Sequence, residues 1–399
     1  MITPKIYQFA STGRNRLISG FNFRKIMKAA NAQRSRSDQT KVAVRLQPTT
    51  ERGHLLAIHR SSCPQQRPNA PRRENNRTPW LRSTLLRTRM SALRGGAQCA
   101  LFLACSIALT TSCSIKRIAV NKVGDALAEG GSTFASDDDP ELVKAAVPFS
   151  LKLMESLLAE SPSHKGLLFA SASGFTQYAY AFVQQDAEEL EEKDIAASLE
   201  MRQRARRLYL RARGYAMRGL ETAHPGFTNA LRADPPAAVK RLTKKDVPLA
   251  YWAAVSWAAA IGIIKNDTDL IAELPQVEAL VDRALELDES YDHGAIHSFL
   301  ITFETTRQDK SGDPAVRARS HFERTVQLTG GHEAGPYVSL AESVSVEQQN
   351  RDDFEKLLHQ ALAIDPNAAP EVRLVNLIMQ RRARWLLAQE DNLIAKKNP

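Results

Sequence analysis

The chain has 399 residues and a formal net charge of +10, which is long enough for one large domain or two ordinary ones. The positive charge is concentrated in residues 1–89, where Lys and Arg greatly outnumber Asp and Glu, whereas residues 90–399 are mildly acidic. This distribution argues against a nucleic-acid-binding body, because phosphate contacts require an excess of basic residues.

Residues 1–89 are rich in Arg, Pro, Gln, Asn and Ser and show no sustained apolar period. Such a segment buries too little apolar surface to offset the entropy lost on ordering, so we expect a disordered basic leader. A nucleic-acid-binding tail and an Arg-rich transit peptide are two functional interpretations. The interpretation we favour is that translation begins at Met90 and that the leader is not part of the native protein.

Residues 90–112 are typical of a lipoprotein signal peptide. The apolar run in "AQCALFLACSIALTTSC" follows Arg94 and is too short for a membrane span of about 20 residues. Cys113 would be the only cysteine of the mature chain. Lipidation of its thiol would explain why an exported protein has a single cysteine and no internal disulfide. A cleaved signal peptide with a free Cys113 is the alternative. Ser114 is not the Asp that typically retains lipoproteins in the inner membrane, so we expect a lipid anchor on the periplasmic side of the outer membrane.

Residues 113–399 show helical periods and almost no strand alternation, which predicts an all-α domain. Asp139 followed by Pro140 is typical of a helix start, and this helix should end at Ser161. Segment 249–264 is apolar nearly all round. It is too short to span a bilayer and therefore predicts a buried central helix.

Three segments share a helix end followed by a turn: 284–296, 325–336 and 361–372. Their spacing approaches that of tetratricopeptide (TPR) repeats without the strict signature, and it predicts a TPR-like array of stacked antiparallel helix pairs. Such arrays bind a peptide, a protein or an apolar ligand on a concave face or in a channel.

The sequence predicts no enzyme, cofactor or metal site. It contains no G-x-S-x-G, P-loop or G-x-G-x-x-G motif. His293 and His297 have the spacing of zinc hydrolases, but Gly294 replaces the required Glu. We therefore expect surface or helix-end histidines. The acidic run 186–194 is expected to fold back beside the arginine-rich helix that follows and to form exposed ion pairs with it; alternatively, those arginines guide an organic anion.

Aromatic residues are concentrated in the helices that we expect to be central. Most should pack the core, but some can line a cavity, because buried Tyr and Trp need partners for their polar ends. The candidate ligand contacts are Tyr178, Tyr215, Tyr251, Trp252 and Trp257.

Four segments together resemble the TatT family, the lipoprotein component of tripartite ATP-independent periplasmic (TRAP) transporters. They read "LLAESPSHKGLLFASASGFTQYAYAFVQQDAE", "RRLYLRARGYAMRGLE", "YWAAVSWAAAIG" and "DPNAAPEVRLVNLIMQRRARWLLAQEDNLI". The resemblance runs from about Cys113 to the C-terminus. It implies a periplasmic, lipid-anchored, TPR-like homotrimer pierced by channels, which binds the substrate-binding P subunit of the transporter. It implies no catalytic residues.

The predicted function is therefore that of an accessory protein that helps to deliver a small apolar or organic-acid ligand to a transport system. The alternative is a TPR-like outer-membrane lipoprotein that serves as a scaffold for envelope assembly.

If Cys113 carries the lipid, Cys113→Ala should abolish metabolic labelling with palmitate and block processing of the precursor. The matched control is Cys105→Ala, which lies inside the signal peptide and should leave labelling intact. Unchanged labelling of the Cys113→Ala variant would rule out lipidation at this residue.

Overall fold

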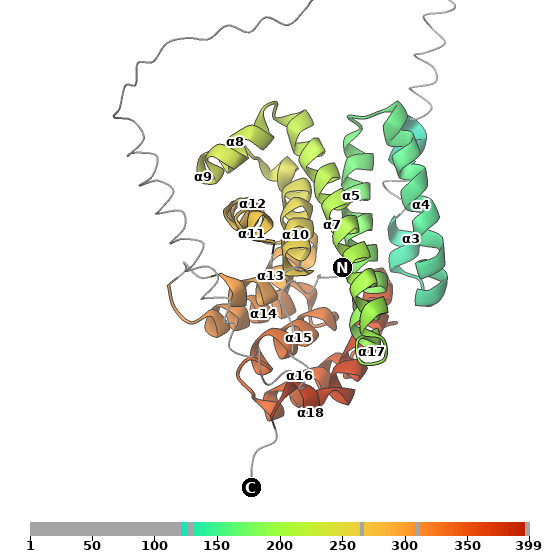
Figure 1. The fold of residues 1–399 in the computed structure, drawn as a ribbon, viewed down its shortest axis with the longest axis vertical. Coiled ribbons are helices and arrows are strands. Elements are labelled where there is room, and N and C mark those ends of the chain that lie inside the picture. Colours follow the sequence, from blue (N-terminus) through green and yellow to red (C-terminus); the bar gives the residue numbers. More distant parts are fainter. Residues whose placement is uncertain (1–120, 127–130, 264–266, 308–310, 396–399) are drawn as a thin grey trace, which may run out of the picture. The chain divides into compact units, whose positions relative to one another are not determined.

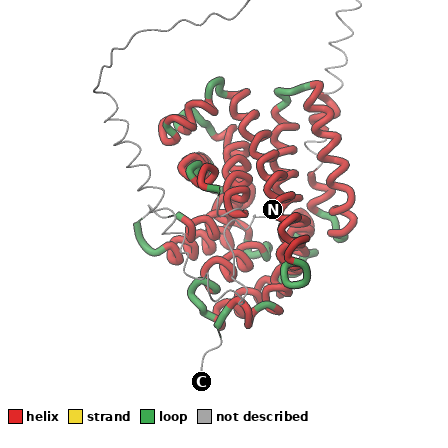
Figure 2. The backbone as a smooth tube through the Cα atoms, viewed as in Figure 1, coloured by secondary structure: helices red, strands yellow, loops and turns green. Residues whose placement is uncertain are grey.

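The structure is a computed structural model that describes residues 121–126, 131–263, 267–307 and 311–395. All regular structure in these ranges is helical, which confirms the all-α prediction for this part of the chain (Figure 1, Figure 2). The described residues belong to one contact unit. The leader 1–89, the signal segment 90–112 and Cys113 lie outside the described residues.

Five helix pairs follow one another along the described chain, and the short α15 of the fourth pair continues directly into the π-helix η4 (Ala341–Ser345) (Figure 1). They are α4 (Pro140–Glu160) with α5 (Lys165–Ala179), α7 (Ile195–Ala223) with α10 (Val247–Ile263), α12 (Leu274–Leu287) with α13 (Tyr291–Phe303), α14 (Pro314–Thr329) with α15 (Gly335–Leu340), and α16 (Arg351–Ala363) with α17 (Arg373–Ala388). The repeated segments 284–296, 325–336 and 361–372 each join the two helices of one pair. This arrangement is the TPR-like array that the sequence predicts.

Shorter helices cap or connect these pairs. They are α3 (Gly131–Ala135), the π-helix η1 (Tyr180–Gln184), α6 (Gln185–Leu190), α8 (Phe227–Ala233), α9 (Pro235–Val239), η2 (Lys244–Asp246), α11 (Thr268–Ile271), η3 (Glu304–Thr306), the π-helix η4 (Ala341–Ser345), η5 (Pro370–Val372) and α18 (Glu390–Leu393).

The first long helix begins and ends where its sequence signals indicate. The Asp139 carboxylate accepts hydrogen bonds from the backbone N–H groups of Glu141 and Leu142, at 3.1 and 3.0 Å. Pro140 occupies the first helical position, where its missing N–H costs nothing. The Ser161 N–H donates to the Leu157 carbonyl and closes the last turn.

Helix α10 is buried on all sides, as its apolar composition predicts. It packs against α5, α7, α12 and α13. With η2 it forms the helical segment Lys244–Ile263, which is long and apolar enough to cross a membrane, but 89% of its apolar window is buried inside the protein. The neighbouring α7 approaches closely at Gly219, where a Cβ atom would lie 2.8 Å from Leu249 Cδ1. The segment is therefore the core helix of the array.

The last helix pair returns to the first. Helix α17 contacts α3 and α4. Arg381 Nη2 donates to Asp186 and Glu189 of α6, at 2.8 and 2.7 Å. The buried Arg382 Nη2 lies 2.5 Å from Glu188 Oε2 of α6. The two ends of the described array are thus joined by charged contacts.

These contacts correct the expected pairing of the acidic run 186–194. Arg202 of α7 does pair with Glu191, but its side chain is buried rather than exposed. The run does fold back beside α7, since α6 packs on that helix. Three of its six acidic residues, Asp186, Glu188 and Glu189, nevertheless pair with arginines of α17. The other α7 arginines that form ion pairs do so elsewhere, for example Arg206 with Asp267 and Arg213 with Glu273.

Replacing Ala259 in α10 by Asp should destabilise the protein by several kcal/mol, about 3–5, because it leaves an unpaired charge at a buried helix contact. Ala196→Asp near the exposed start of α7 is the matched control and should change little. Urea unfolding followed by circular dichroism measures both. Equal midpoints for the two variants would contradict the central position of α10.

A candidate acid–aromatic ligand site

Three of the five predicted aromatic residues have their polar groups bonded within the protein. Tyr178 Oη accepts from Arg204 Nη2 at 3.4 Å. Tyr215 Oη donates to Glu155 at 2.6 Å. Trp257 Nε1 donates to Glu273 at 2.9 Å.

These three residues also do not form one group. Tyr178 stacks obliquely on Phe182, whereas Tyr215 stacks on Phe175 and lies beside α4. Trp257 lies under the guanidinium of Arg213, whose carbon is 4.6 Å from the ring centroid. The structure therefore distributes them over separate contacts between helices.

Tyr251 and Trp252 lie together in the first turns of α10. Their ring centroids are 5.0 Å apart, and the Tyr251 ring also contacts Tyr291 at 5.5 Å and Phe299 at 6.4 Å. Tyr251 is fully buried, yet its hydroxyl has no hydrogen-bond partner within the described part of the chain. Leaving such a group unpaired costs about 1–3 kcal/mol, which makes this hydroxyl unusual in an otherwise packed core.

The start of α13 has an unusual backbone. Asp292, His293 and Gly294 have φ values of 46°, 54° and 89°, in the left-handed region. Glycine adopts this conformation readily, and here a Cβ atom would also lie 2.9 Å from Leu328 Cδ1. For Asp and His the conformation is uncommon and costs on the order of 1–3 kcal/mol each, a cost that is often found at functional sites.

This backbone places His293 and His297 in different surroundings, and the expectation of surface or helix-end histidines is wrong for His297. The regular helix begins only after Gly294, so the two imidazoles do not share a helical face. His293 is exposed, as expected of a helix-end residue. His297 is buried, with its Nδ1 2.8 Å from Nδ1 of His321 and its Nε2 3.4 Å from Glu289. Among the described residues, no group of three or more His, Cys, Asp or Glu side chains is arranged to hold a metal ion.

Two carboxyl groups are held near these aromatic rings. Glu333 precedes α15 and is only 8% exposed. Burial raises its pKa, the charge of Asp292 raises it further, and His293 opposes the shift. Asp292 is solvent-accessible, but the protein around its carboxyl raises its pKa as well.

The charges of Asp292 and Glu333 also affect the pKa of the unpaired Tyr251 hydroxyl. Burial raises the pKa of Tyr251, and Tyr291, Asp292 and Glu333 add to that shift. These shifts connect Tyr251, Tyr291, Asp292, His293 and Glu333, and Trp252 joins them through its ring contact with Tyr251. We call these six residues the acid–aromatic cluster.

The repeat architecture explains how the cluster assembles. Its residues lie at the starts of α10, α13 and α15, which are the second helices of three successive pairs. Tyr251 and Trp252 were predicted from their aromatic character, whereas Asp292 and Glu333 were not. Both acidic residues lie in the repeated turns 284–296 and 325–336, so the alignment of these turns was the signal that could have revealed them.

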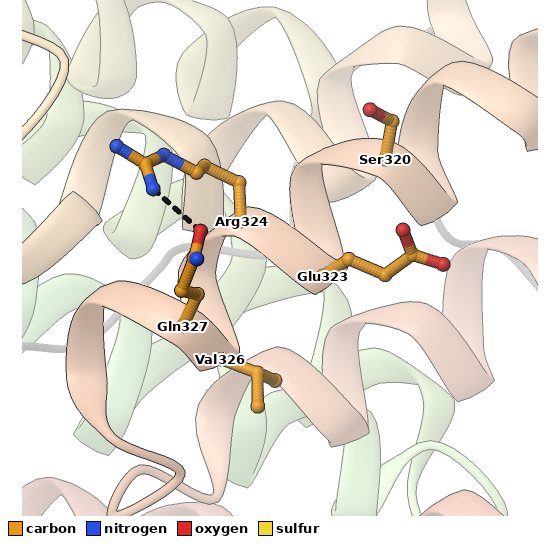
Figure 3. A pocket seen from close by; sticks show the side chains of 5 residues that line it. All are labelled: Ser320, Glu323, Arg324, Val326 and Gln327. Carbon is orange, nitrogen blue, oxygen red and sulfur yellow. Dashed lines mark hydrogen bonds between the residues drawn. The ribbon is translucent and has the colours of Figure 1, made fainter.

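A second surface feature lies on α14 and contains none of the predicted residues. It is a hollow of about 530 Å³ that is lined, within the described residues, by Ser320, Glu323, Arg324, Val326 and Gln327 (Figure 3). Arg324 Nη1 donates to Gln327 at 2.5 Å, as the dashed line in Figure 3 shows, and Nη2 of the same side chain pairs with Glu289. Because Arg324 already pairs with Gln327 and Glu289, the acid–aromatic cluster is the stronger candidate.

An array of TPR-like helix pairs places the chain in the class of helical-repeat proteins. Residues 136–394 match the family described as "TAtT: TRAP transporter T-component", and the chain belongs to this family. The chain is also 32% identical over 301 residues to an uncharacterized protein of Treponema pallidum (strain Nichols), an alignment that covers 71% of this chain and 93% of that protein. The resemblance to TatT is therefore confirmed, and the family assigns the chain an accessory role in TRAP transport.

Glu333→Gln should stabilise the protein at neutral pH. A raised pKa means that the folded state holds the proton more tightly than the unfolded chain, so stability falls as pH rises through that pKa. The Gln variant avoids this loss. Its melting temperature should exceed that of the wild type near pH 7, by roughly 2–4 °C for each kcal/mol gained, and match it below about pH 4.

Thermal melts between pH 4 and pH 8 provide the test. Glu371→Gln, in the exposed corresponding turn before α17, is the control and should follow the wild type throughout. A Glu333→Gln protein that melts below the wild type near pH 7 would show that the ionised Glu333 is stabilised rather than strained.

Proposed function

We propose that this chain is the lipid-anchored T-component of a TRAP transport system, which binds the periplasmic substrate-binding P subunit and holds a small ligand. The observation that carries this proposal is the family match over residues 136–394, which spans nearly the whole described array. The signal segment 90–112 and Cys113 support an anchor on the periplasmic side of the outer membrane. Because the family is an accessory component of transport, we propose no reaction for this chain.

Exposed apolar residues support contacts with other proteins. Leu142 and Phe149 on α4 are 58% and 74% exposed, and their seven-residue spacing places them on one helical face. Ile195 and Leu199 form a second exposed pair at the start of α7. Two such faces suit the two contacts that the proposal requires, one between copies in a homotrimer and one with the P subunit.

The ligand site of the proposal is the acid–aromatic cluster. Two of the five aromatic residues predicted to contact a ligand, Tyr251 and Trp252, lie in it. The remaining three, Tyr178, Tyr215 and Trp257, are weaker candidates for ligand contact, because their polar groups already have hydrogen-bond partners within the protein.

A scaffold for envelope assembly at the outer membrane is the second candidate function. TPR-like helix pairs with exposed apolar faces suit that role equally well. Binding of the P subunit distinguishes the transport component from the assembly scaffold, because a scaffold for envelope assembly is not expected to bind that subunit.

The protein without its lipid should sediment as a trimer and form a complex with the P subunit encoded beside it. The complex should persist in about 0.5 M NaCl, because salt screens exposed charges and leaves apolar contacts in place. Phe149→Ser should abolish either trimer formation or binding of the P subunit. Sedimentation of the variant with and without the P subunit shows which of the two is lost.

Val316→Ser is the matched control, since Val316 is a comparably exposed apolar residue on α14. A strict monomer that binds no co-encoded P subunit would contradict the transport proposal and favour the assembly scaffold.

A further inference from the structure

Four arginines of α7 form a row along the exposed face of that helix. Arg204, Arg211 and Arg218 follow one another at intervals of seven residues, and Arg207 lies one turn after Arg204. All four side chains are exposed. Seven residues make nearly two helical turns, so these arginines share one face, and their row is about 21 Å long. We call these four residues the arginine row.

Aromatic rings support three of the four guanidinium groups. The distance from guanidinium carbon to ring centroid is 5.9 Å for Arg204 over Tyr178, 5.4 Å for Arg211 over Phe175 and 5.3 Å for Arg218 over Tyr215. A ring in this position attracts the guanidinium and limits its movement, while the N–H groups at its edge can still donate. Side chains held in this way lose less entropy when they bind an anion.

Most of the charge of the arginine row is not neutralised by the described part of the chain. Arg211 has a carboxylate partner, Glu155, at 3.4 Å. Arg204, Arg207 and Arg218 form no ion pair with any described residue. The three α7 arginines outside the row each do form one; they are Arg202, Arg206 and Arg213. The row therefore suits anionic groups from outside the chain.

The spacing of the row favours an extended anionic surface over a small organic anion. Successive stacked arginines are about 10 Å apart along the helix axis, and each is held over its own ring. An anion of a few atoms would therefore contact one arginine at a time. A layer of anionic phospholipids presents many phosphate groups at once, and arginine binds phosphate through two parallel N–H···O hydrogen bonds.

The proposed lipid anchor would hold the membrane close to this row. Gly124 approaches the start of α5, where a Cβ atom would lie 2.9 Å from Leu167 Cδ1. Leu167 packs in the same apolar cluster as Tyr215, whose ring supports Arg218. Cys113 precedes Gly124 by eleven residues, which span at most about 40 Å. A tether of this length raises the effective concentration of headgroups at the row, whereas an acidic protein would have to bind from solution.

We propose that the arginine row binds the phosphate headgroups of anionic phospholipids, so that α7 lies along the membrane that holds the lipid anchor. The inference rests on the proposed anchor at Cys113 for the position of the membrane. It requires neither the P subunit nor the acid–aromatic cluster.

Vesicle binding of the protein without its lipid tests the row independently of the anchor. Co-sedimentation compares vesicles of about 30% phosphatidylglycerol in phosphatidylcholine with vesicles of phosphatidylcholine alone. One arginine near an anionic surface contributes about fivefold in affinity, so the protein should prefer the anionic vesicles at least about fiftyfold at low salt. This preference should disappear in about 0.5 M NaCl, because the contacts are between exposed charges.

The double variant Arg204→Gln/Arg218→Gln should bind the anionic vesicles about twentyfold more weakly than the wild type. Arg232→Gln/Arg384→Gln is the matched control, because it removes the same charge from two exposed arginines of α8 and α17 and should bind like the wild type. Circular dichroism checks that both variants are folded. A wild type that binds both kinds of vesicle equally, or two double variants that bind equally, would overturn the proposal.

Binding of the P subunit provides a second readout. If Arg204→Gln/Arg218→Gln loses the P subunit but keeps its affinity for anionic vesicles, the row binds an acidic protein surface and the membrane proposal is wrong. Because the vesicle assay uses neither the lipid nor the P subunit, its failure would leave the proposed anchor and the proposed partner standing. Failure of the anchor or of the partner would likewise leave the measured vesicle preference unchanged.

Discussion

The array depends on the charged contacts that join its two ends, and the most deeply buried of these contacts is made by Arg382. Arg382 of α17 is 1% exposed and lies between Glu188 of α6, at 2.5 Å, and Glu342 of η4, at 2.8 Å. Burial alone would lower the pKa of this guanidinium, but the two carboxylates outweigh burial and raise it. The side chain therefore stays charged, and Trp385 covers it with its ring 4.3 Å away. Removing one partner of such a buried group typically costs about 3–5 kcal/mol.

Both carboxylate partners of Arg382 lie in or directly after a local departure from α-helical geometry. The π-helical segment η4 contains Glu342, and the other segment, η1, directly precedes α6, which carries Glu188. Each π-segment shifts the register of the residues that follow it, which re-aims their side chains. With its ends joined in this way, we expect the array to hold the starts of α10, α13 and α15 in place. These are the positions from which the acid–aromatic cluster is built.

The parts of the structure that the sequence predicted are local. The Asp139–Pro140 helix start, the buried α10 and the three repeated turns each follow from residues within one segment. The parts that it did not predict join distant residues. Arg382 and Glu188 are far apart in the chain, as are Tyr251 and Glu333, and no periodic pattern encodes such pairs. The left-handed turn at Asp292 was missed for a related reason, because the close approach of Gly294 to Leu328 involves another helix pair.

The most direct test of this account is hydrogen–deuterium exchange of the Arg382→Met variant compared with the wild type. The account predicts faster exchange at both ends of the array, in 180–190 and 341–345 as well as in α17, together with faster exchange at 291–296, where the cluster lies. Arg381→Met is the matched control, because this neighbouring side chain is 39% exposed and its loss should have only a local effect. Faster exchange confined to α17 in the Arg382→Met variant would show that the two ends are held together by other contacts and that Arg382 does not support the acid–aromatic cluster.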